Sequence, residues 1–131
     1  MASKFRSASK AAVGLGLTDV YTQQLGTGQT DKQTVIVGIT LCNVTTSAVN
    51  ASVKIDRPAV SLTVAGQNPV STEDIWLAKN IPIPAGSSIE IMAGNKIVMA
   101  YNVANGAGDK LQAQSSAAAS LDVIVSYMEI A

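Results

Sequence analysis

The 131-residue chain contains no histidine, which removes the commonest general base near neutral pH and the commonest zinc ligand. Catalytic systems that pair a serine or cysteine nucleophile with histidine are therefore excluded. The single cysteine, Cys42, excludes an internal disulfide. Because it lies within an expected strand, we interpret Cys42 as a small apolar side chain and not as a reactive thiol.

The acidic residues also lack a catalytic pattern. Glu73 and Asp74 form the one adjacent pair, and the other acids are scattered beside turns or at outward positions. Glycoside hydrolysis requires two carboxylates that flank one bond. A phosphate loop, a complete dinucleotide fingerprint and a calcium loop are missing as well. We therefore expect no catalytic residue, no cofactor, no metal site and no small-molecule substrate, so the chain is not predicted to be an enzyme.

Charge is sparse and balanced. The chain has nine cationic and nine anionic residues, and charged residues make up 14% of it. A nucleic-acid binder normally carries a basic field, so the balance disfavours nucleic acid as the main partner. A surface with so few charges is typical of a subunit that copies and partners partly cover. The chain also lacks a run of ~20 apolar residues, so we expect no membrane contact.

The first ten residues depart from this balance. They contain Lys4, Arg6 and Lys10 together with Phe5, and no acid. Residues 1–17 show no sustained periodicity, and we expect them to form an extended arm. The arm either contacts an acidic neighbour or DNA, or is a solvated terminus.

Alternation of apolar and polar residues predicts short strands. In the clearest, residues 33–43, one face carries Val35, Val37, Ile39 and Leu41. Further strands are expected at residues 18–22, 51–56, 74–79, 88–92, 96–101, 110–115 and 120–130, and residues 59–64 are expected to extend the sheet. The two prolines in residues 81–86 favour an extended connection there. The pattern predicts an all-β fold, an antiparallel β-sandwich or jelly roll of about seven or eight short strands, with residues 18–131 as one domain.

The second face of the expected strands carries more apolar residues than a sheet face exposed to water should. These residues lie opposite the main apolar rows, and we predict that they form an oligomer interface: Ile36, Cys42, Ile124, Met128 and Ile130. A loop or the arm folded over this face within one subunit is the alternative. We expect a homo-oligomer, with a trimer as the working assumption.

Three stretches together resemble small structural proteins of tailed-bacteriophage virions, including cyanophage-like myovirus particle proteins. They are Leu17-Thr18-Asp19-Val20-Tyr21-Thr22 with the following strand, residues 77–90 (LAKNIPIPAGSSIE), and residues 108–113 (GDKLQA) with residues 120–126 (SLDVIVS). The resemblance extends over residues 17–130. It implies a β-sandwich present in many copies on a virion, without catalytic residues.

The sequence therefore favours a non-enzymatic virion protein with other virion proteins as partners. We expect this protein either at the tail, neck or fibre attachment, or on the capsid surface as a decoration protein. The alternative is a module at a fibre tip that binds a host glycan or receptor. That role would use Arg57, Trp76 and Tyr101 as a ligand or partner loop.

Overall fold

The structure is a computed structural model that describes residues 3–23, 33–57, 73–92, 96–102 and 107–130. These residues form ten strands and no helix. The strands are β1 (Ser3–Val13), β2 (Thr18–Thr22), β3 (Gln33–Asn43), β4 (Val49–Arg57), β5 (Glu73–Ile83), β6 (Ser88–Glu90), β7 (Ile97–Asn102), β8 (Ala107–Gly108), β9 (Lys110–Ser115) and β10 (Leu121–Ile130). No helix that could cross a membrane occurs in these ranges.

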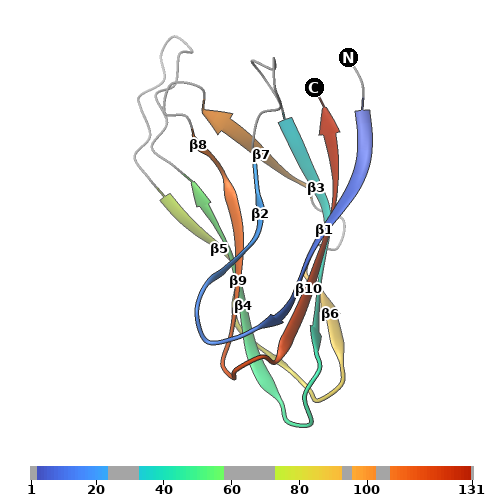
Figure 1. Ribbon diagram of the computed structural model, residues 1–131, viewed down its shortest axis with the longest axis vertical. Coiled ribbons are helices and arrows are strands. Elements are labelled where there is room, and N and C mark those ends of the chain that lie inside the picture. The colour runs from blue at the N-terminus through green and yellow to red at the C-terminus, as the bar shows by residue number, and fades with distance from the viewer. Residues whose placement is uncertain (1–2, 24–32, 58–72, 93–95, 103–106, 131) are drawn as a thin grey trace.

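The strands build two sheets that pack against each other (Figure 1). Sheet A has the order β1-β10-β3-β7-β8, and β6 pairs with β3 further along the strand. Sheet B has the order β2-β9-β4-β5. All described pairings are antiparallel, which confirms the predicted antiparallel β-sandwich.

The strand bounds follow the sequence pattern where one face is buried. β2 and β3 have the predicted bounds, and β9 covers residues 110–115 as expected. β5 is longer than predicted and includes Pro82. Proline is tolerated there because β5 is the edge strand of sheet B, where a missing amide hydrogen leaves no ladder position empty. Residues 59–64, which were expected to extend the sheet, lie outside the described residues.

Residues 3–13 do not extend from the domain as an arm. They form β1, which pairs with β10 of the same chain in an uninterrupted register from Ser3–Ile130 to Lys10–Val123. Most β1 side chains are exposed on both faces, because β1 lies at the edge of sheet A. An exposed edge strand needs no alternating pattern, which explains why the sequence did not reveal it.

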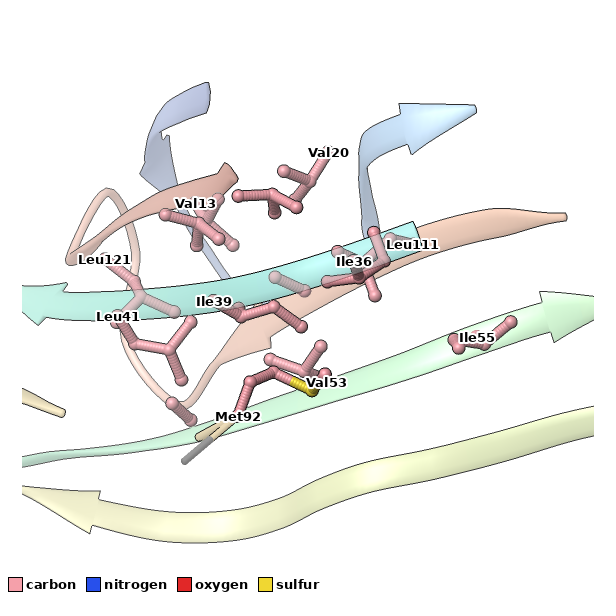
Figure 2. Close-up of a cluster of buried hydrophobic side chains, with 14 of the residues drawn as sticks. Val13, Val20, Ile36, Ile39, Leu41, Val53, Ile55, Met92, Leu111 and Leu121 are labelled. Carbon is pink, nitrogen blue, oxygen red and sulfur yellow. The ribbon is translucent and has the colours of Figure 1, made fainter. Parts of the chain in front are cut away.

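The core lies between the sheets (Figure 2). β10 contributes every second residue, from Leu121 to Tyr127, and β4 contributes Ala51, Val53 and Ile55. Tyr21 of β2 and Tyr127 of β10 bring the sheets together at one end, with ring centroids 4.5 Å apart. Burial of this apolar surface is the main contribution to the stability of the fold.

A bulge in β3 changes which of its residues face the core. Gly38 lies opposite Ser126, but Ile36 lies opposite Tyr127, so Val37 is an extra residue. The extra residue shifts the alternation, and Ile36 becomes fully buried beside the expected core residue Ile39. The prediction that Ile36 faces outward with the interface residues is therefore wrong.

Glu90 of β6 stabilises the bulged part of β3. Its carboxylate accepts hydrogen bonds from the amides of Ile39 and Met92, each at 2.9 Å, and from the hydroxyl of Thr40. Burial raises the pKa of Glu90, but the three hydrogen bonds outweigh it and hold the pKa below its ordinary value. The carboxylate therefore stays charged at neutral pH and binds the amide of Ile39 between the segments of β3 that pair with β7 and with β6.

Candidate assembly surface

The outer face of sheet A carries a row of apolar side chains that runs across four strands. Residues directly opposite each other on antiparallel strands share a face. Phe5 lies opposite Met128, Met128 opposite Val35, and Val35 opposite Val98. Met128 alternates with the buried Tyr127, so the whole row points away from the core. We call these four residues the apolar row.

The apolar row is open to solvent at both ends. The side chain of Phe5 on β1 is 79% exposed, and that of Val98 on β7 is 56% exposed. Met128 and Val35, which lie between them, are half-buried by their neighbours. Exposed apolar side chains are common singly, but a contiguous row of them marks an interaction surface.

Ile124 lies on the same outer face, four residues from Met128 along β10. Its side chain is 46% exposed and borders a shallow hollow of about 250 Å³. Residues 9–11 of β1, Thr40 and Cys42 of β3, and residues 122–124 of β10 line the hollow. Between this hollow and the apolar row lies a row of small residues: Ser7, Ser126 and Gly38.

Three of the five predicted interface residues lie on the outer face of sheet A, one lies in the core, and the side chain of the fifth is not described. Ile124, Met128 and Cys42 occupy the outer face of sheet A, whereas Ile36 lies in the core. Ile130 pairs with Gln33 and Ser3, and its side chain lies outside the described part of the structure. Sequence reasoning missed Phe5, Val35 and Val98 as members of this face, because it assigned Phe5 to an arm and placed Val35 in the core row.

The basic residues of β1 lie along the edge of sheet A. Lys4, Arg6 and Lys10 are all exposed. Arg6 forms an ion pair with Glu129 of the neighbouring β10 at 3.4 Å. Pairing of β1 with β1 of another copy would bring the same cations of both copies together, so these residues oppose that contact.

The residues predicted to form a ligand loop belong to three strands, β4, β5 and β7, and the loop stays a prediction. Trp76 is on β5 of sheet B and Tyr101 on β7 of sheet A. The side chains of Arg57 and Tyr101 lie outside the described part of the structure. Trp76 is 37% exposed, but the ammonium nitrogen of Lys79 lies 3.8 Å from its ring centroid. The indole is therefore engaged in a cation–π contact and is not a free platform for a sugar ring.

The outer face of sheet B is polar. Asp19, Gln112, Lys54 and Trp76 lie opposite one another on its four strands. The amide of Gln112 donates to Asp19 at 2.7 Å, and Lys54 lies 5.5 Å from the centroid of Trp76. This face thus satisfies much of its own polar surface, unlike the outer face of sheet A.

The pKa shift of Tyr21, like that of Glu90, has its causes in burial and in hydrogen bonds within the fold. Burial raises the pKa of the Tyr21 phenol, against a smaller lowering by its hydrogen bond with Thr34. The phenol also donates to the side chain of Gln23 at 2.9 Å, in a cluster that links β2 to β3. Within the described ranges, no group of three or more histidine, cysteine or acidic residues is placed to hold a metal ion.

The sequence matches no protein-family model and no curated protein. Among solved structures, the chain is similar to a protein of Bacillus endospore appendages, described as a family of disulfide-linked pili. The identity is 16% and the TM-score 0.40, over 98% of this chain and 85% of that one. It is also similar to a chain of infectious bursal disease virus, Gx strain, with 11% identity and a TM-score of 0.41. A third similar chain comes from T=1 particles derived from that virus, with 10% identity and a TM-score of 0.37. This chain spans about a third of the length of each viral chain, and these similarities concern the fold alone.

Proposed function

We propose that the chain is a non-enzymatic structural subunit of a tailed-phage virion, which acts through contacts with copies of itself and with other virion proteins. The observation that carries the proposal is the apolar row on the outer face of sheet A. Phe5, Val98 and Ile124 together present large apolar side chains to solvent on one sheet face. An exposed apolar face of this kind marks a surface that another protein covers.

Composition supports the same function. Charged residues make up 14% of the chain, against ~25% of the residues in a typical soluble domain. Copies packed on a particle have less surface in contact with water and therefore need fewer charges. The resemblance of residues 17–130 to small phage particle proteins supports a place on the virion, either at the tail, neck or fibre attachment, or as a decoration of the capsid surface.

Quantitative mass spectrometry of purified particles tests this function. We expect the chain in multiple copies per particle of the phage that encodes it, and cryo-electron microscopy should locate those copies. A chain that is abundant in infected cells but absent from purified particles would overturn the proposal. Binding to a glycan array that depends on Trp76 would instead favour the host-recognition alternative.

A further inference from the structure

The apolar row has a symmetry that a second copy of the chain can use. Its most exposed members, Phe5 and Val98, lie at the two ends, and the half-buried Met128 and Val35 lie between them. A twofold axis parallel to the strands, passing between β10 and β3, exchanges the ends of the row. Phe5 of one copy then faces Val98 of the other, and Met128 faces Val35.

We propose that two copies of the chain pack sheet A against sheet A through the apolar row, in a twofold-symmetric contact. This inference rests on the proposed function, because it names the partner that covers the exposed face. The contact is isologous, so each copy contributes the same residues. It extends the sandwich by the same aligned packing of sheet on sheet that builds the domain itself. A pair of copies differs from the trimer expected from sequence.

The neighbouring rows fit the same arrangement. In the row formed by Ser9, Ile124, Thr40 and Glu90, the same axis places Glu90 of one copy over the small polar Ser9 of the other. The cations of β1 lie opposite Glu129, Tyr127 and Val123, so they point to the other face of sheet A and away from this contact. Ile124 faces Thr40 of the second copy, so the hollow beside Ile124 is covered.

The size of the face matches a modest but specific interface. β1, β10 and β3 each contribute about nine residues, and β7 and β6 share the fourth strand position beside β3. With ~4.8 Å between strands and ~3.3 Å per residue, the face is on the order of 600 Å². Two copies together bury about 1,200 Å², the lower end of the range for specific protein interfaces. The rest of the described surface is less suited to a contact between two copies, because the outer face of sheet B is polar and cations line the edge at β1.

Cross-linking tests the pairing directly. Phe5 and Val98 of one copy are three strand spacings apart, or about 14 Å, on the same face. Facing residues on packed sheets are closer than this, at about 10 Å between backbones. In a Cys42→Ser background, Phe5→Cys combined with Val98→Cys should give a covalent dimer with a bis-maleimide reagent whose reach is below ~10 Å. Peptide mapping should find the linkage between positions 5 and 98.

The single variants are the controls for the geometry. Phe5→Cys alone and Val98→Cys alone, each with Cys42→Ser, should yield little dimer, because equivalent residues of the two copies lie at opposite ends of the row. Strong dimer formation by either single variant, or an absent linkage between 5 and 98 in the double variant, overturns the proposed arrangement.

Sedimentation of the intact chain gives an independent measurement. The wild type should sediment at twice 13.4 kDa, and Phe5→Asp or Val98→Asp should weaken the dimer about tenfold or more. Leu15→Asp is the matched control, because Leu15 is 62% exposed in the loop between β1 and β2 and its substitution should leave the dimer intact. Circular dichroism checks that each variant is folded.

Failure of this arrangement is distinguishable from failure of the proposed function. A chain that is present on particles but lacks the linkage between 5 and 98 retains its virion role and loses this interface. A chain that forms the predicted linkage but is absent from particles keeps the interface and loses the virion role.

Discussion

The carboxylate of Glu90 accepts the amide hydrogen of Ile39 at 2.9 Å and so joins β6 to β3 immediately after the bulge. Glu90→Ala removes this bond together with those from Met92 and Thr40. We expect the free energy of unfolding to fall by about 1–2 kcal/mol, because water replaces part of the interaction at this exposed carboxylate. Urea denaturation measures the loss. Asp19→Ala, which removes an acid bound to the side chains of Gln112 and Lys110, should cost less than half as much.

Glu90 also predicts a dependence of stability on pH. Its pKa in the folded protein is below the ordinary value of 4.5, so the folded state favours the ionised carboxylate. The stabilisation is therefore fully present above pH 4.5 and is lost as the pH falls through the lower pKa of the folded state. Denaturation of the wild type and of Glu90→Gln at a series of acidic pH values should show a smaller pH dependence for the variant. Equal slopes would contradict this role of Glu90.

Asn43 fixes the turn after β3 to the end of β5. Its side chain is fully buried, donates to the carbonyl oxygens of Ser47 and Ile83, and accepts the amide hydrogen of Thr45. Asn43→Ala leaves these buried groups without their partner, and we expect a loss of about 2–4 kcal/mol in stability. Thermal denaturation checks this value, with the exposed Asn50→Ala as the control. A loss below 1 kcal/mol would show that water replaces these bonds.

Gly108 is required by a close backbone contact. A β-carbon at this position would lie 2.0 Å from the carbonyl oxygen of Gln23, whose own amide donates to Asp109. Gly108→Ala should therefore displace this segment and destabilise the fold by about 3 kcal/mol or more. Gly16→Ala is the matched control, since a β-carbon there meets no atom within 4 Å. Similar melting temperatures for the two variants would contradict this account.

Ile36 and Ile124 should respond oppositely to substitution, although both were predicted to face outward. Ile36→Ala creates a cavity in the core and should cost about 2–5 kcal/mol of stability. Ile124→Ala should change the stability of the folded monomer by less than about 1 kcal/mol, because its side chain is 46% exposed. Denaturation at low protein concentration separates these effects from those on association.

The contrast between these two isoleucines shows how far the sequence predicts the structure. Strict alternation in β10 placed Ile124 and Met128 on the outer face correctly, because β10 contains no extra residue. The same rule failed for Ile36, since the bulge at Val37 adds one residue and reverses the alternation. Gly38 was a weak signal of this bulge, and the Glu90 carboxylate that accepts the amide hydrogen of Ile39 beside it comes from a strand about fifty residues later.

The apolar row was harder to predict than the individual strands. It joins residues that are far apart in the chain, such as Phe5 and Val98, and it depends on the strand order of sheet A. Alternation predicts strands but not which strands are neighbours. Phe5 was also hidden by the exposure of β1, whose two faces are both too polar to reveal a strand.

The cations of β1 have a consequence for how the protein behaves in salt solutions. Pairing of the β1 edges of two copies would bring Lys4, Arg6 and Lys10 close to the same residues of the other copy, and their mutual repulsion opposes this contact. Dissolved ions shorten the range of that repulsion from ~10 Å at 0.1 M to ~3 Å at 1 M. Concentrated brine should thus favour pairs of copies joined edge to edge through β1, whereas dilute buffer should disfavour them.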